Sequence, residues 1–198
     1  MWAALARALP RGPLLAVTAA LLLSACQPES TPYFGVDIKG AGYGQQWALI
    51  DQNGQPRTPA DFRGKLQLFY FGFTQCPDIC PETLGHLKSA LTLLGPQRDQ
   101  VRALFVTVDA DTDTPAVLKS YLAGFGPDFI GLTGTQTALA AAAKDFRVYS
   151  KRKEGSAASF EHAGFVYLLD RTGAPRLLYG PEATPAGMAS DLKRLLVE

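Results

Sequence analysis

Residues 65–81 read KLQLFYFGFTQCPDICP, and this stretch decides the fold. Its first nine residues are almost continuously apolar and aromatic, which is typical of a central strand that is covered on both faces. Two cysteines, Cys76 and Cys80, follow this run. A helical pattern begins directly after them, with leucines three or four residues apart, and ends at Gly95-Pro96. The cysteines are therefore predicted to lie between a buried strand and the first turn of a helix.

The rest of the chain continues this alternation of strands and helices. A second apolar strand is predicted at 101–108, and strand, helix and strand in succession indicate a right-handed crossover within a parallel sheet. We predict a mixed α/β sheet with helices on both faces, ending in a β-hairpin and a helix. The further predicted elements are a strand at 46–50 leading into the Asn53-Gly54 turn, a helix from Thr114-Pro115, a strand at 129–132, a helix at 135–146, a strand at 147–150, hairpin strands at 162–169 and 176–179, and a helix at 184–197.

Composition excludes several classes of protein. The chain has 198 residues, of which 47% are hydrophobic and 19% are charged, so it can bury a core and is not a disordered polymer. Lysine and arginine number 19 against 18 acidic residues, and the net charge of +1 gives no reason to expect a nucleic-acid partner. Only two histidines are present, which excludes a site built from several histidines.

The N-terminal segment has the pattern of an export signal. Residues 1–25 combine arginines, a short apolar run and small residues at the end, and the run is shorter than the roughly 20 residues of a membrane span. The sequence Leu23-Ser24-Ala25-Cys26 resembles the bacterial lipobox, which implies cleavage before Cys26 and lipid on that residue. The alternative is ordinary cleavage nearby that leaves Cys26 as a free thiol. We expect an exported protein, lipid-anchored to a bacterial membrane and facing the periplasm or the cell exterior.

Two further segments complete the predicted organisation. Residues 27–44 are rich in proline, glycine and serine and indicate a flexible tether after the lipidated cysteine. Residues 45–198 show no repeat and no second change of composition, so they are expected to form one domain.

The two cysteines of the domain are the clearest candidates for chemistry. If the residues between them are helical, positions i and i+4 face the same way, within reach of a disulfide or of one shared metal ion. A helix N-terminus also stabilises a thiolate, which is the nucleophile and the metal-binding form. The plainer alternative is a small structural disulfide, which so short a loop makes strained and reducible. Asp78, between them, is interpreted as a helix-end carboxylate, or else as a group that supports the site or docks a partner.

A third ligand would have to come from far along the chain. His162 lies 82 residues beyond Cys80, and a histidine at a strand start is more often a surface residue than a ligand. Two thiolates and one imidazole nevertheless form a soft set that suits Cu(I). Structural zinc needs four ligands, and His86 is predicted to face solvent on its helix, so zinc is disfavoured.

The segment 71–81 resembles the signature of the SCO/SenC proteins, which are assembly factors of cytochrome c oxidase. The similarity continues through 106–109, 113–115, 131–134 and His162 before 167–170. This resemblance implies a thioredoxin-like fold, with Cys76, Cys80 and His162 as ligands of one copper ion, Cu(I) or Cu(II). It also implies the copper-bearing oxidase subunit as partner, with another periplasmic copper chaperone as a further one.

The sequence departs from the family pattern in two places. Glu161 precedes the histidine where many members have aspartate, and it is a second candidate for supporting the site or docking a partner. Ala110 and Thr112 replace a usual proline and arginine, which weakens any partner-binding role of the loop 109–113.

Two functions remain open from the sequence. The first is copper delivery to the binuclear copper site of the oxidase, which needs no chemical turnover. The second is an enzymatic function, in which Cys76 and Cys80 alternate between dithiol and disulfide and reduce the cysteines of that copper site. The two uses exclude each other at any instant, because a disulfide sulfur is not a thiolate ligand. Three residues separate the cysteines rather than the two of common redox motifs, which favours metal binding.

Overall fold

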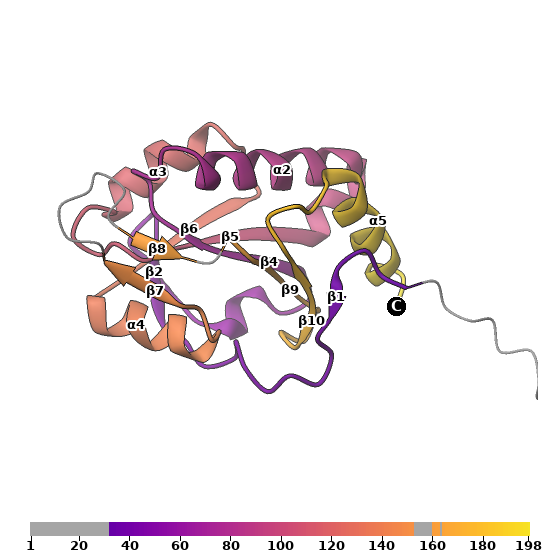
Figure 1. Cartoon of the computed structure of the whole chain (residues 1–198), viewed down its shortest axis with the longest axis horizontal. Helices are drawn as coiled ribbons and strands as arrows, with labels where there is room; N and C mark the ends of the chain where they lie inside the picture. The colour runs from indigo at the N-terminus through magenta and orange to yellow at the C-terminus, as the bar shows by residue number, and fades with distance from the viewer. Residues whose placement is uncertain (1–31, 153–159, 163) are drawn as a thin grey trace, which may run out of the picture. The chain divides into compact units, whose positions relative to one another are not determined.

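The computed structural model describes residues 32–152, 160–162 and 164–198, with side chains for 32–149 and 164–198. Residues 33–198 form one compact unit. Its main sheet has eight strands in the order β1-β10-β9-β4-β5-β6-β2-β3, and β7 and β8 form a separate pair (Figure 1). The strands are β1 (Val36–Asp37), β2 (Leu49–Asp51), β3 (Pro56–Arg57), β4 (Leu66–Gly72), β5 (Val101–Thr107), β6 (Phe129–Thr133), β7 (Ser150–Arg152), β8 (Phe160–His162), β9 (Val166–Leu169) and β10 (Pro175–Tyr179).

The centre of the sheet confirms the predicted crossover. Strands β4, β5 and β6 run parallel, while β9 and β2 flank them antiparallel. Every residue of β4 is buried, as its unbroken apolar sequence predicts. The helices are α2 (Ile79–Leu93), α3 (Pro115–Ala123), α4 (Gln136–Asp145) and α5 (Pro185–Leu195), with short 3-10 helices η2 (Pro59–Phe62) and η3 (Gly95–Gln100).

Helices cover both faces of the sheet, so the predicted fold class is confirmed. Leucines from α2, α3 and α5 pack on one face in a first core, and α4 with η2 covers the other face in a second core (Figure 1). Cys76 contacts both cores, which places it where the two layers meet. The carboxyl end of β4 leads into the segment that carries the cysteines.

The prediction of a single strand over residues 162–169 is wrong. Residues up to His162 form β8, which pairs with β7, whereas β9 begins only at Val166 and joins the main sheet. Gly164 lies between the two strands, where a Cβ would stand 2.8 Å from the Cδ1 atom of Ile79, so glycine lets the chain pass close to the cysteine segment.

The predicted strand 147–150 is also shifted. Arg147 adopts a left-handed conformation, with φ of 57°, and its N–H donates to the carbonyl of Lys144 in the turn that ends α4. Strand β7 therefore begins only at Ser150. The left-handed residue redirects the chain before the strand can start.

Part of the predicted tether belongs to the domain. Strand β1 pairs with β10, and the buried carboxylate of Asp191 accepts backbone N–H bonds from Phe34 and Gly35, both at 2.9 Å. The chain is therefore held by hydrogen bonds well before residue 45. The signal segment and Cys26 lie outside the described residues, and none of the described helices is long and apolar enough to span a membrane.

Candidate metal centre

The two cysteines lie at the junction that the sequence predicts, but the local geometry differs. Cys76 lies in the loop after β4, and Cys80 is the second residue of α2. The residues between them are not all helical, since Asp78 stands at the N-cap with φ of −128° and ψ of −71°. The sulfurs nevertheless meet, because the Cys76 side chain hydrogen bonds to Cys80. Both cysteines are free thiols.

The sulfur of Cys80 is enclosed on every side. The residue is 0% exposed, and the Tyr70 hydroxyl donates to its Sγ at 3.5 Å. A Cβ built at Gly72 would lie 2.8 Å from the same Sγ and 2.9 Å from the Phe105 ring, so only glycine fits at that position. Cys80 is therefore held in one place by the strand behind it.

Burial decides the protonation of Cys80. It raises the pKa of this thiol to about 12, although hydrogen bonds from Tyr70 and from the backbone of Phe73 act to lower it. For Cys80, burial opposes the predicted stabilisation of a thiolate at the helix N-terminus. A metal ion or a disulfide partner has to displace its proton.

Cys76 differs from Cys80 in its exposure. It is half-buried, in a turn in which its backbone N–H donates to the carbonyl of Phe73 at 3.3 Å. Its neighbours Pro77 and Asp78 are exposed. Cys76 is thus partly exposed at the surface, whereas Cys80 is buried in the core.

A buried carboxylate fixes the loop that carries Cys76. Asp113 is 0% exposed and accepts hydrogen bonds from the Thr74 N–H at 3.0 Å, the Thr74 hydroxyl at 2.5 Å and the Thr107 hydroxyl at 2.6 Å. Thr107 is the last residue of β5, so these hydrogen bonds, here called the Asp113 clamp, join the loop that carries Cys76 (the thiol loop) to the neighbouring strand. Sequence reasoning missed this role of Asp113. No local pattern in the sequence distinguishes Asp113 from the other aspartates of the loop 109–113.

The backbone brings the His162 region back to the cysteines. His162 ends β8 opposite Ser150, and Gly164, two residues later, packs against Ile79 between the cysteines. The side chains of His162 and Glu161 lie outside the described residues, so their roles stay predictions. Among the side chains that the structure describes, no group of three His, Cys, Asp or Glu could hold a metal ion.

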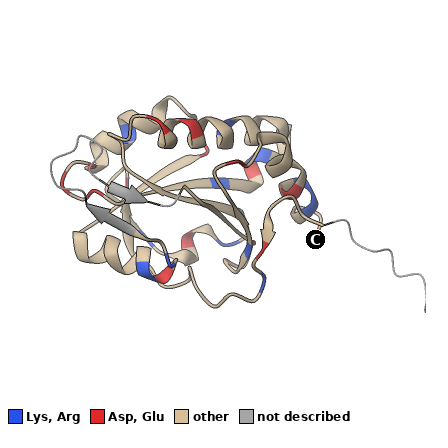
Figure 2. Ribbon diagram, viewed as in Figure 1, with Lys and Arg blue, Asp and Glu red and all other residues tan. Residues whose placement is uncertain are grey.

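Asp78 and His86 are the other polar candidates near the cysteines in the sequence. Asp78 is exposed and stands at the N-cap of α2, so it lies at the predicted helix end, but its side chain makes no capping hydrogen bond. His86 is half-buried on α2 rather than fully solvated. Figure 2 shows basic and acidic residues interspersed over the described elements, as expected for a chain with almost no net charge.

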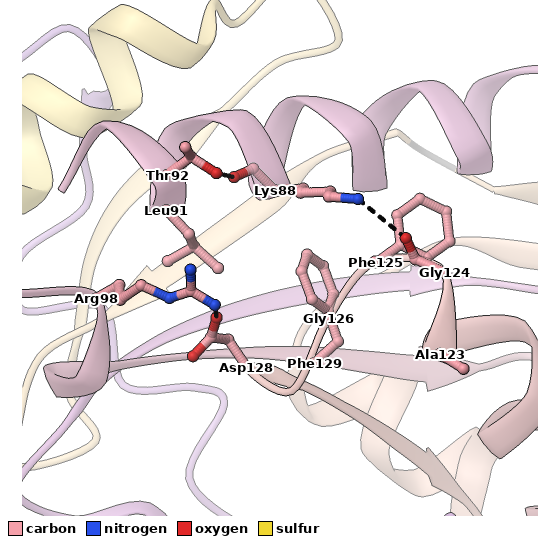
Figure 3. A pocket seen from close by; sticks show the side chains of 10 residues that line it. All are labelled: Lys88, Leu91, Thr92, Arg98, Ala123, Gly124, Phe125, Gly126, Asp128 and Phe129. Atoms are coloured by element: carbon pink, nitrogen blue, oxygen red, sulfur yellow. Dashed lines mark hydrogen bonds and ion pairs between the residues drawn. The ribbon is translucent and has the colours of Figure 1, made fainter. Parts of the chain in front are cut away.

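A cavity elsewhere in the domain has no connection to the thiols. It measures about 220 Å³ and lies beside the far half of α2 (Figure 3). Lys88 in its wall is eight residues after Cys80, a rise of about 12 Å along the helix. The two basic side chains in its wall already have partners. Lys88 donates to the Gly124 carbonyl at 3.0 Å, and Arg98 pairs with the Asp128 carboxylate at 2.6 Å.

Comparison with known proteins gives consistent matches over this domain. A family model described as SCO1/SenC matches residues 36–197. An SCO2-like protein of Rickettsia felis is 38% identical over 159 residues, which are 77% of this chain and 78% of that protein.

Solved structures extend the match to three dimensions. The structure of Bradyrhizobium japonicum ScoI with copper bound is 36% identical, with a TM-score of 0.69, covering 81% of this chain and 98% of that chain. BsSco, described as a member of the Sco family of cytochrome c oxidase assembly proteins with a disulfide switch, is 25% identical with a TM-score of 0.67, covering 80% of this chain and 96% of that chain.

Proposed function

The chain belongs to the SCO1/SenC family, and from this premise we propose that it binds one copper ion and delivers it to the binuclear copper site of cytochrome c oxidase. The observation that carries the proposal is the side-chain interaction between the partly exposed Cys76 and the buried Cys80 at the end of a central strand. The copper-bound ScoI structure, similar over 81% of this chain, supports copper as the cargo.

The ligands of the copper ion would be Cys76, Cys80 and His162. Two thiolates and an imidazole form a soft three-coordinate set that suits Cu(I). The packing of Gly164 on Ile79 supports His162, because it holds the chain two residues beyond the histidine against the cysteine segment. Both thiols would lose their protons when copper binds, so copper binding is expected to release protons.

Transfer would proceed by ligand exchange between thiolate-rich sites. Cys76 is the sulfur that an incoming ligand of the acceptor can reach, whereas Cys80 is buried and would release the ion last. No electrons change hands in such an exchange. A copper-bearing oxidase subunit is the proposed acceptor and a periplasmic copper chaperone the proposed donor, with lipid on Cys26 anchoring the protein to the membrane.

The contact between the sulfurs also favours a second candidate function. As a dithiol, the pair could reduce a disulfide of the acceptor: two electrons and two protons pass to the acceptor, and a Cys76–Cys80 disulfide remains. The disulfide switch described for BsSco supports this alternative. The acceptor would then receive copper from another source.

One experiment separates the two functions. The copper-loaded full chain, carrying Cys26→Ser so that no third thiol competes, is mixed with a copper-free oxidase copper domain that is already reduced. Delivery predicts that copper moves to the acceptor, and the Cys80→Ser variant, which should not retain copper, serves as control. If no copper moves, but the copper-free chain reduces the oxidised acceptor, the reductase function replaces delivery.

A further inference from the structure

Tyr70 is placed to control one of the two sulfurs. It lies in β4, is 0% exposed, and its hydroxyl donates to the Cys80 Sγ at 3.5 Å. Thr83 of α2 hydrogen bonds to the same hydroxyl. The phenol is thus held between the strand that ends at the thiol loop and the helix that carries Cys80.

The surroundings leave this hydroxyl little freedom to move. Tyr70 is paired on both sides within the sheet, with Phe105 of β5 and Val166 of β9. Its ring also packs on that of Phe105, with 6.1 Å between ring centroids. The hydrogen bond to sulfur therefore lies in the buried centre of the sheet.

A hydrogen bond of this kind discriminates between states of the sulfur. A donated proton stabilises a sulfur that carries negative charge more than it stabilises a neutral sulfur, because bonds to charged acceptors are stronger. A thiolate, free or bound to metal, carries more negative charge than a neutral thiol, and a disulfide sulfur is a weaker acceptor than either thiol or thiolate. The Tyr70 hydroxyl consequently favours the reduced pair over the disulfide.

We propose that Tyr70 is a positioning residue for Cys80, which holds the buried sulfur in its reduced, metal-accepting form. This inference deepens the proposed function and rests on it for the identity of the cargo. It explains why a pair of touching thiols is kept available for a metal ion, and it leaves Cys76 as the sulfur that exchanges with a partner.

The first test needs no copper. Tyr70→Phe, made in the full chain with Cys26→Ser, removes the hydroxyl and keeps the ring. The chain is equilibrated with glutathione: oxidised glutathione accepts two electrons and two protons from Cys76 and Cys80, giving two reduced glutathiones and the protein disulfide. We expect Tyr70→Phe to favour the disulfide threefold to tenfold, a potential about 15 to 30 mV more negative.

Tyr121→Phe is the matched control. Its ring also packs on Phe105, at 5.8 Å between centroids, and its buried hydroxyl has no hydrogen-bond partner among the described residues. Tyr121 lies close enough to Cys80 and Cys76 to interact with them electrostatically, but its hydroxyl donates no hydrogen bond to sulfur, so this variant should change the glutathione equilibrium less than Tyr70→Phe does. An equilibrium constant of Tyr70→Phe equal to that of the wild type, or an equal change in both variants, would overturn the proposal.

A second readout reports on the sulfur in the loaded protein. The thiolate-to-Cu(II) charge-transfer band should move to lower energy in Tyr70→Phe, since the sulfur electrons lose the stabilising proton. An unmoved band in a protein that binds copper would overturn the proposed effect on the metal-bound sulfur. Failure of the wild type to bind copper would instead contradict the proposed function, and the glutathione result would still decide the role of Tyr70.

Discussion

The substitution Asp113→Ala tests how the thiol loop is held. Asp113 is fully buried and accepts three hydrogen bonds, two from Thr74 and one from Thr107. Each such bond contributes about 1 to 1.5 kcal/mol net, and loss of the carboxylate leaves the Thr107 hydroxyl without this acceptor in the core. We therefore expect the free energy of unfolding to fall by about 3 to 5 kcal/mol.

The assay is urea unfolding of the reduced chain, followed by circular dichroism. The midpoint should fall while the slope stays constant, which identifies a change in stability rather than in the unfolded state. Asp113→Asn keeps one acceptor oxygen and should lose about 1 to 3 kcal/mol. The matched control is Asp111→Ala, an exposed acid of the same loop, which should change stability by less than about 1 kcal/mol. A fall of less than about 1 kcal/mol in the free energy of unfolding for Asp113→Ala would contradict the proposed role of Asp113 in holding the thiol loop.

Two more predictions concern the packing and protonation of Cys80. Gly72→Ala places a Cβ 2.8 Å from the Cys80 Sγ, so it should lower the free energy of unfolding in urea by about 1 to 3 kcal/mol. The control Gly85→Ala has no atom within 4 Å of the new Cβ and should not destabilise the protein. Equal effects of the two substitutions would contradict close packing at Gly72. The pKa of Cys80 is raised from 9.0 to about 12, so the unfolded chain loses this proton first and stability should fall as pH rises through that interval. The fall should be smaller in Cys80→Ala, measured by unfolding between pH 8 and about 10.5, and an identical pH dependence would refute a buried neutral thiol.

Local sequence signals were sufficient for most of the regular elements. The continuous apolar run of β4 predicted a buried central strand, and all its residues are buried. Thr114, Thr135 and Thr184 begin the predicted helices, and each hydroxyl accepts a backbone N–H of the first turn. These signals act within a few residues, which is why the sequence alone reveals them.

Features that depend on distant residues could not be predicted in this way. The close approach of Gly164 to Ile79 joins segments 85 positions apart, and the attachment of Phe34 depends on Asp191, 157 positions later. The same holds at the candidate site. The cysteine pair was evident from its spacing, but the contacts of Tyr70 and Asp113 arise only when β4, β5 and α2 assemble. The residue types alone made His162 a weak candidate for the third ligand, and the family resemblance strengthened it.

The central claim is that Cys76, Cys80 and His162 together hold one copper ion. Its most direct test is an anaerobic Cu(I) titration of the reduced full chain with Cys26→Ser, against a competing chelator. His162→Ala is compared with His86→Ala, which removes the other histidine of the chain. We predict one tightly bound equivalent, weakened by at least tenfold, or about 1.4 kcal/mol, in His162→Ala and unchanged in His86→Ala. Weak binding by the wild type, or equal affinity in both histidine variants, would contradict the three-ligand site.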